Sequence, residues 1–242
     1  LPITLALMLS WTKSALGAPR RKLVDMAQHW PQRESIQSIL SIMMLHSPLM
    51  MIGGAMGGAD FINLLYTEFM HYDPENPAYP FRDRFFLDPG HMSPMLYAQL
   101  ALAGKFTIEE LKQFRQWGSP TPGHPELDVM RGIENTSGPL GQGHVYAVGA
   151  AMAAKFLAAR TGNPTFLKET IYAYISDGGI QEEISQGAGR VAGTLGLDNL
   201  VMFFDSNDIQ LSTECADVCT EDTAMKYRAW GWHVITIDGN DC

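Results

Sequence analysis

The stretch Thr170-Ile-Tyr-Ala-Tyr-Ile-Ser-Asp-Gly-Gly179 gives the strongest indication of the fold. Its opening residues form a short apolar run that is typical of a buried strand. Apolar residues then recur at helical spacing over residues 180–195, and a second apolar run follows at residues 200–204. Strand, helix and strand in this order predict a βαβ unit, and therefore an α/β fold built on a mostly parallel sheet.

Polar residues follow both of these strands. Asp177 comes directly after the first strand, and Asn207 comes after the second, thirty positions later, with Ile209 close behind. Because parallel strands end on the same edge of a sheet, we expect Asp177 and Asn207 to lie side by side. Carboxylate and amide oxygens are hard ligands suited to Mg²⁺ or Ca²⁺, which would also hold phosphate oxygens and water. The pair therefore favours a metal-bound diphosphate.

The residues after Asp177 are consistent with that interpretation. Gly178 and Gly179 allow close approach of the backbone, and the N-terminus of the following helix would offer free N–H groups to the phosphates. An ordinary strand-to-helix turn, with Asp177 as its N-cap and an unrelated turn at Asn207, explains the same residues. Taken alone, the short pattern leaves both interpretations open.

Several blocks of the sequence resemble the transketolase family. Ser176-Asp-Gly178, followed by Asn207, is similar to the thiamine diphosphate motif, which usually has Gly where this chain has Ser176. Further blocks follow the family's order: Asp88-Pro-Gly-His-Met-Ser93, Ser119-Pro-Thr-Pro-Gly-His-Pro-Glu126, Thr136-Ser-Gly-Pro-Leu-Gly-Gln-Gly143, Gly193-Thr-Leu-Gly-Leu197 and Asp205-Ser-Asn-Asp-Ile209. Several ordered blocks are far more specific than any single motif.

The resemblance covers about residues 53–241 and implies a thiamine diphosphate-binding fold. In that fold, three layers form around a mostly parallel sheet with helices on both faces. Residues 53–242 would be the pyrophosphate domain, and residues 1–52 a divergent segment, an insertion or an error in the gene model. The family's pyrimidine-binding and C-terminal domains have no counterpart in this chain.

The resemblance also assigns roles to individual residues, with thiamine diphosphate and Mg²⁺ or Ca²⁺ as cofactors. The metal ligands would be Asp177, Asn207 and the backbone carbonyl of Ile209. The cofactor-binding positions would be His91, Gly138, Leu140, Asp177, Gly178 and Asn207. His91 and His124 match the catalytic histidines, of which His124 would approach the C1 hydroxyl of the donor sugar.

Turn chemistry offers another explanation for three of these positions. His91 follows Pro89-Gly90, and His124 lies between Gly123 and Pro125, so both imidazoles could simply be exposed in loops. The segment from Gly138 to Gly143 could be only a Gly-Pro turn that opens a helix over residues 145–160. The family resemblance, and not the spacing, favours a functional role.

The function implied by the resemblance is ketol transfer. A transketolase moves a two-carbon group from a ketose phosphate to an aldose phosphate, and the protein contributes orientation, proton transfer and electrostatic support. Another thiamine diphosphate enzyme, such as a 1-deoxyxylulose-5-phosphate synthase, is an alternative, although Thr121-Pro-Gly-His-Pro-Glu126 argues against it. A non-catalytic binding or assembly module is the alternative from a different class.

Met51 motivates this last alternative. The family carries Ser-Gly-His-Pro-Gly-Gly where this chain reads Leu49-Met-Met-Ile-Gly-Gly54, so Met51 replaces an expected active-site histidine. A thioether neither moves a proton nor donates a hydrogen bond. His46 lies five residues upstream and is not expected to reach the same place.

The length implies a partner, because the activating glutamate of the family belongs to a domain that this chain lacks. We expect either a fragment of a longer chain or the N-terminal subunit of a split enzyme. The start at Leu1 and the end after Gly239-Asn-Asp241 favour a fragment. A homodimer or heterotetramer is expected by analogy. Glu182 would lie at the subunit contact, or it would simply stabilise a helix N-terminus.

Composition is consistent with one α/β domain, since 46% of the 242 residues are hydrophobic and 18% are charged. A net charge of -9 argues against nucleic-acid binding. The odd set Cys215, Cys219 and Cys242 favours reduced thiols and a cytoplasmic location. Residues 1–16 are apolar but lack a basic start and are too short to span a membrane, so an amphipathic or disordered helix is expected there.

Overall fold

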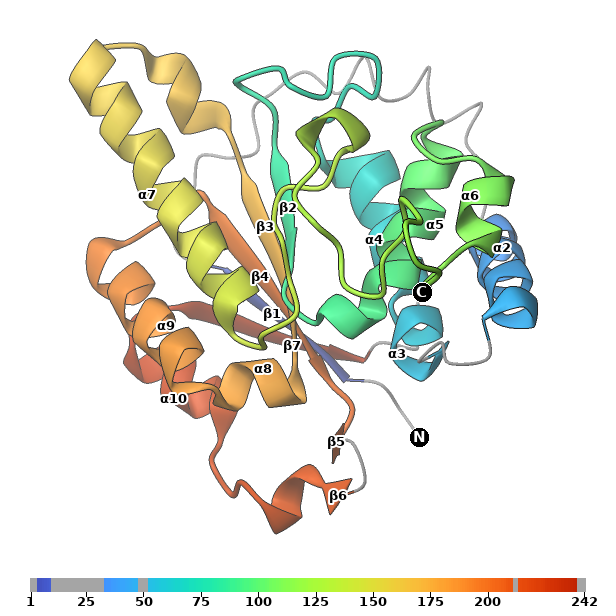
Figure 1. Ribbon diagram of the computed structural model, residues 1–242. Coiled ribbons are helices and arrows are strands. Elements are labelled where there is room, and N and C mark those ends of the chain that lie inside the picture. Colours follow the sequence, from blue (N-terminus) through green and yellow to red (C-terminus); the bar gives the residue numbers. More distant parts are fainter. Residues whose placement is uncertain (1–3, 10–32, 48–51, 211–212, 239–242) are drawn as a thin grey trace. The chain divides into compact units, whose positions relative to one another are not determined.

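The computed structural model describes residues 4–9, 33–47, 52–210 and 213–238 (Figure 1). These residues form two compact units, and each is discontinuous in sequence. Unit 1 contains Leu1–Ala15, Arg84–Pro89 and Pro139–Cys242, and unit 2 contains Leu16–Asp83 and Gly90–Gly138.

Unit 1 is built on a five-stranded sheet with the strand order β2-β3-β4-β1-β7. Its strands are β1 (Thr4–Leu9), β2 (Arg84–Leu87), β3 (Ile171–Ser176), β4 (Leu200–Ser206) and β7 (His233–Asp238). Strands β2, β3 and β4 are parallel, whereas β1 is antiparallel to both of its neighbours. β7 therefore runs in the direction of β4. The expected α/β fold with a mostly parallel sheet is confirmed.

The expectation of a helix at the N-terminus is wrong, because Thr4–Leu9 forms strand β1. A short apolar run cannot be assigned to helix or strand by periodicity alone. Pairing with β4 on one side and β7 on the other gives its backbone groups hydrogen-bonding partners that a sequence does not reveal.

Helices of unit 1 pack on the sheet and on one another. They are α7 (Gln142–Thr161), α8 (Asp177–Gln181), α9 (Glu183–Leu195) and α10 (Thr223–Ala229). α7 lies against β2, β3 and β4 and also packs on α9, and Figure 1 shows α7, α9 and α10 on one side of the sheet. Small side chains make this packing close, since Ala147, Ala151 and Ala154 of α7 are buried. Among the described helices, none is long and apolar enough to cross a membrane.

The helix expected over residues 180–195 is divided in two. Glu182 has an extended backbone, with φ -63° and ψ 132°, and it separates α8 from α9. Two short hairpin strands follow β4, namely β5 (Ile209–Gln210) and β6 (Thr213–Glu214). The two predicted strands of the βαβ unit are confirmed as β3 and β4.

Unit 2 is helical. Its α-helices are α2 (Arg33–His46), α3 (Ile52–Gly57), α4 (Ala59–Leu64), α5 (Ser93–Leu102) and α6 (Ile108–Lys112). A π-helical turn (Leu65–Phe69) continues α4, and short 3₁₀ turns lie at Gly90–Met92 and Val129–Arg131. α5 is the central helix, because it contacts α2, α3, α4 and α6 and its first eight residues are buried. A helix that is buried on all sides is the core of its unit.

Candidate active site

Asp177 and Asn207 lie together at the ends of two neighbouring strands. β3 and β4 are parallel, with Ser176 paired to Asp205, so the residues that follow each strand come out on the same edge. The backbone N–H of Asn207 donates a hydrogen bond to Oδ2 of Asp177 at 3.0 Å. The expected juxtaposition of these two residues is confirmed.

A tight turn follows Asn207. Its side-chain oxygen accepts a hydrogen bond from the backbone N–H of Ile209 at 3.1 Å, which closes an Asx turn. Asp208, between them, has φ +61°, a left-handed conformation that Asp adopts more readily than most residues. The turn leads directly into β5, whose first residue, Ile209, pairs with Glu214 of β6.

The carboxylate of Asp177 is buried and lies near two other acidic residues. Its side chain is only 6% exposed, and burial is the main reason that its pKa is raised to about 6. Nearby Asp205 and Asp208 raise the pKa further, whereas the N–H of Asn207 and the Cys215 thiol lower it. Burial and neighbouring acids disfavour the ionised carboxylate, and a bound cation would offset that cost.

The residues present fit a hard divalent cation. Asp177, Asn207 and Ile209 would supply a carboxylate, an amide and a carbonyl oxygen, the donors that Mg²⁺ and Ca²⁺ prefer. Across the described residues, no group of three or more His, Cys, Asp and Glu side chains could hold a metal. A metal at Asp177 would therefore need neutral oxygens and diphosphate or water ligands as well. Asp177 also lines a cavity of about 380 Å³.

Two glycines follow Asp177 at the N-terminus of α8. A Cβ atom on Gly178 would lie 3.1 Å from Cδ1 of Leu140, so these two predicted cofactor-binding residues lie next to each other. A Cβ atom on Gly179 would lie 2.3 Å from Oδ2 of Asp88. Only glycine fits at position 179 unless Asp88 moves.

Asp88 is a residue whose importance the sequence analysis missed. It follows β2, is fully buried, and accepts hydrogen bonds from the backbone N–H groups of Gly141 and Gly143. One signal was available, because Asp88 follows the buried run at residues 85–87 in the same way that Asp177 follows β3.

Within unit 2, His91, His124 and Gly138 lie close together. A Cβ atom on Gly90 would lie 2.8 Å from Cδ2 of His124 and 3.0 Å from the backbone nitrogen of Gly138. The alternative in which His91 is an exposed loop imidazole is wrong, because its side chain is partly buried. Burial is the main cause of the lowered pKa of His91, and the positive charges of His124 and Arg115 contribute. His124 is exposed, as a turn alone would predict.

Hydrogen bonds to backbone carbonyl groups hold the loop that carries His124. The Ser93 hydroxyl donates to the carbonyl of Gly123 at 2.8 Å, and the Tyr97 hydroxyl donates to the carbonyl of Pro122 at 3.0 Å. On the other side of His124, the backbone N–H of Ser137 donates to the carbonyl of Pro125 at 3.0 Å. His124 is therefore presented by a fixed loop although its own ring is exposed.

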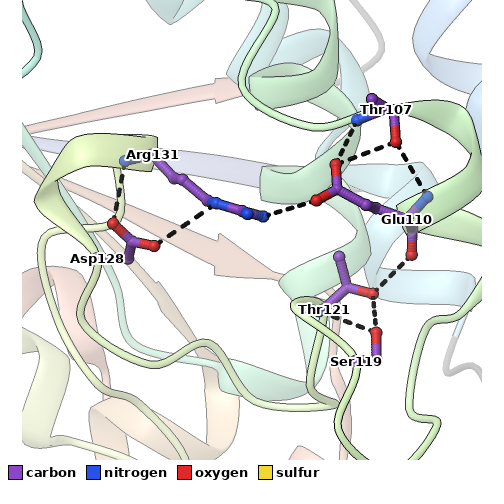
Figure 2. Close-up of polar contacts among 6 residues, drawn as sticks. All are labelled: Thr107, Glu110, Ser119, Thr121, Asp128 and Arg131. Atoms are coloured by element: carbon purple, nitrogen blue, oxygen red, sulfur yellow. Dashed lines mark hydrogen bonds and ion pairs between the residues drawn. The ribbon is translucent and has the colours of Figure 1, made fainter.

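A polar network anchors both ends of the same loop (Figure 2). The Thr121 hydroxyl donates to the carbonyl of Glu110 at 3.0 Å. The side chain of Glu110 closes a capping box with Thr107 and accepts a hydrogen bond from Arg131 at 3.1 Å. Arg131 also pairs with Asp128 at 3.7 Å. Glu110 of α6 therefore contacts the Pro/Gly-rich loop over residues 119–134 near both of its ends, through its backbone carbonyl and through its side chain.

Three further residues from the sequence analysis have different outcomes. Met51, which replaces the expected histidine, lies outside the described residues. His46 is exposed at the end of α2, with its ring nitrogen 2.8 Å from the carbonyl of Ile42. Glu182 is exposed and forms the N-terminal boundary of α9, and its side chain makes no capping hydrogen bond there.

These features define a domain of the thiamine diphosphate-binding class, with a carboxylate and an amide at one sheet edge. Residues 51–242 match the family described as transketolase, thiamine diphosphate binding domain. The chain belongs to this family.

Relatives and solved structures support the assignment. Transketolase 1 of Escherichia coli K12 is 45% identical over 193 residues, which cover 78% of this chain and 29% of that protein. A Streptococcus pyogenes transketolase is 45% identical over 194 residues, which cover 78% and 27%. The transketolase structure from Campylobacter jejuni has a TM-score of 0.75 at 35% identity, and covers 86% of this chain and 32% of that one. The chain therefore spans less than a third of the length of these proteins.

Proposed function

We propose that this chain is the diphosphate-binding part of a transketolase. It would take part in transfer of a two-carbon ketol group from a ketose phosphate to an aldose phosphate. The observation that carries the proposal is the hydrogen bond between Asn207 and the buried carboxylate of Asp177, at the edge where two parallel strands end. Residues 53–242 are proposed as the pyrophosphate domain.

The cofactor proposal assigns roles to the residues of this chain. Thiamine diphosphate would supply the carbanion chemistry when bound. Asp177, Asn207 and the carbonyl of Ile209 would hold Mg²⁺ or Ca²⁺ against the diphosphate. Gly178 would offer its backbone N–H to the phosphates at the start of α8, where such groups are free.

The histidines of unit 2 are proposed to exchange protons and to contact the diphosphate and the sugar substrate. His91 would contact the diphosphate, and its lowered pKa keeps the imidazole neutral at pH 7, able to donate from one nitrogen and accept at the other. His124 would contact the sugar hydroxyl from its fixed loop. Gly138 and Leu140 would pack near the rings of the cofactor.

The remaining proposals concern partners and location. A pyrimidine-binding part, in a separate subunit or in the rest of a longer chain, would complete the site, and a homodimer or heterotetramer is the proposed assembly. The free thiols of Cys215 and Cys219 support a cytoplasmic location.

Complementation tests the proposed activity. The chain is mixed with the pyrimidine-binding and C-terminal domains of a transketolase, and transfer from a ketose phosphate to an aldose phosphate is measured. We expect transfer above background that disappears with Asp177→Ala. The substitution Met51→His tests the non-catalytic alternative: if neither the wild type nor this variant transfers a ketol group while both bind thiamine diphosphate, the chain is a binding module.

A further inference from the structure

Asp88 joins the end of β2 to the turn that precedes α7. Its two carboxylate oxygens have different partners: Oδ2 accepts from the N–H of Gly141 at 3.0 Å, and Oδ1 accepts from the N–H of Gly143 at 2.8 Å. Gly141 has φ +86°, so glycine is required at the point where the chain turns into α7. Asp88 therefore holds both residues that flank Gln142 at the start of this helix.

Two glycines, Gly143 and Gly179, also lie close against Asp88. A Cβ atom on Gly143 would lie 2.5 Å from Cα of Asp88, and a Cβ atom on Gly179 would lie 2.3 Å from its Oδ2. Neither glycine can be replaced without moving Asp88, because such distances are well inside van der Waals contact. The carboxylate thus fills a slot between the turn before α7 and the turn at the start of α8.

The charge on Asp88 suits this slot. Burial raises the pKa of Asp88 to about 6, and Glu182 raises it too, whereas the N–H groups of Gly141, Gly143 and His144 lower it. The carboxylate is therefore ionised above about pH 6 and lies at the positive end of the dipole of α7, a helix of 20 residues.

We infer that Asp88 is a positioning residue for the diphosphate site, an inference that rests on the proposed function. Its hydrogen bonds to Gly141 and Gly143 hold the Leu140–Gly141 turn in place beside Gly178 and Gly179. We call this arrangement the Asp88 clamp. Leu140 then stays next to Gly178, and the turn at the start of α8 keeps its position. Asp88 touches neither the metal nor the substrate in this account, and acts through the two turns.

The substitution Asp88→Asn tests the clamp with almost no change in shape. Asparagine offers one acceptor oxygen and an NH₂ group, so one of the two backbone N–H groups would face a donor. We expect faster amide hydrogen exchange in peptides covering residues 139–146 and 177–183 of the chain alone. We also expect thiamine diphosphate with Mg²⁺ to bind roughly 10-fold more weakly or worse, with the pyrimidine-binding half present.

Glu169→Gln is the matched control. Glu169 is a buried carboxylate of the same unit, 3% exposed, and it lies before β3 at the end opposite to Asp177. It should change thermal stability without changing cofactor affinity. If Asp88→Asn lowers only the melting temperature and leaves exchange and cofactor affinity as in Glu169→Gln, Asp88 is merely structural and the inference is wrong.

Gly179→Ala provides a second test if Asp88→Asn does not fold. The added methyl group would displace the carboxylate from the other side of the slot, so exchange at residues 139–146 should again rise. Unchanged exchange there would overturn the clamp. If the unmodified protein binds no thiamine diphosphate, the proposed function fails, and the exchange measurement still decides whether Asp88 orders the two turns.

Discussion

The carboxylate of Asp177 and the backbone N–H of Asn207 are joined by a 3.0 Å hydrogen bond across thirty residues of sequence. The bond connects the ends of β3 and β4. It lies at the edge of the sheet where the metal and diphosphate are proposed to bind. Burial, with a smaller effect of Asp205 and Asp208, raises the pKa of Asp177, so its ionised carboxylate destabilises the free protein, and we propose that a bound cation offsets this cost.

Asp177→Asn should therefore stabilise the free protein and weaken cofactor binding. The folded-state pKa of Asp177 is raised from 3.8 to about 6, so its favourable contribution is present below pH 3.8 and is lost as the pH rises through 6. At pH 8 the neutral amide should raise the melting temperature, by about 2–4 °C for each kcal/mol gained. Calorimetry should show cation-dependent thiamine diphosphate binding weakened by roughly 100-fold or more.

Asp217→Asn is the control for this substitution, since Asp217 is an exposed acid in the loop after β6. It should leave both the melting temperature and the cofactor affinity nearly unchanged. A destabilised Asp177→Asn protein at pH 8 would contradict the electrostatic description of this edge.

The sequence predicted that Asp177 and Asn207 lie together because two simple rules apply to this edge of the sheet. Short apolar runs bounded by Asp177 and by Asn207 marked the strand ends, and parallel pairing then placed those ends together. Asp88 was missed because its partners are backbone N–H groups of Gly141 and Gly143, which lie more than fifty residues away and have no side chains that could mark them.

Gly193→Ala should destabilise unit 1. A Cβ atom there would lie 1.9 Å from the backbone oxygen of Trp230, and backbone cannot move aside as a flexible side chain can. We expect a loss of about 1–3 kcal/mol or more in the free energy of unfolding, measured by urea denaturation. Gly187→Ala, in the same helix, meets nothing within 4 Å and should gain about 0.5–1 kcal/mol. Equal effects of the two substitutions would mean that α9 does not pack on Trp230 as described.

His144 should make the protein sensitive to acid. It is fully buried in α7, its Nδ1 lies 2.8 Å from the Ser185 hydroxyl, and burial lowers its pKa from 6.5 to about 4. A depressed histidine pKa contributes stability that is present above pH 6.5 and is lost as the pH falls toward 4. The stability difference between wild type and His144→Leu should fall by up to about 1.4 kcal/mol per pH unit in this window.

The comparison with His144→Leu is needed because other groups act in the opposite direction. Asp88 and Asp177, with pKa values raised to about 6, make the folded state more stable as the pH falls from 6 toward 3.8. Both proteins carry these carboxylates, so the difference isolates the imidazole. Parallel stability curves between pH 7 and pH 4 would show that His144 is not buried as a neutral ring.

Arg131→Gln should loosen the loop that carries His124. Arg131 pairs with Glu110 and Asp128, and its guanidinium lies 4.9 Å from the centre of the Phe106 ring (Figure 2 shows the two ion pairs). Loss of this network should cost about 1–2 kcal/mol and speed proteolysis within residues 119–134.

Lys112→Gln serves as the comparison for Arg131→Gln, because it removes the i,i+3 pair with Glu109 on α6. A surface pair of this kind contributes at most about 0.5 kcal/mol. If both variants are cleaved in the loop at the same rate, Arg131 does not order it.

Helical periodicity was less informative about which faces are buried. Leu64 and Phe69 are large apolar residues in the α4 region, yet both are exposed, and a π-helical turn follows α4. In α9, Ile184 and Val191 follow the predicted spacing and are nonetheless exposed, at 50% and 44%. Tertiary packing, which a single sequence does not contain, decides which apolar residues enter the core.

The most direct test of the central claim is calorimetry of thiamine diphosphate binding, with Mg²⁺ and with the metal removed by chelation. The chain should be measured with the pyrimidine-binding half of a transketolase present, and Asp177→Asn should be measured in parallel. We predict binding that requires the metal and is strongly weakened in the variant. Binding that is absent, or that is equally tight without metal and with Asn at position 177, would contradict a diphosphate site at Asp177 and Asn207.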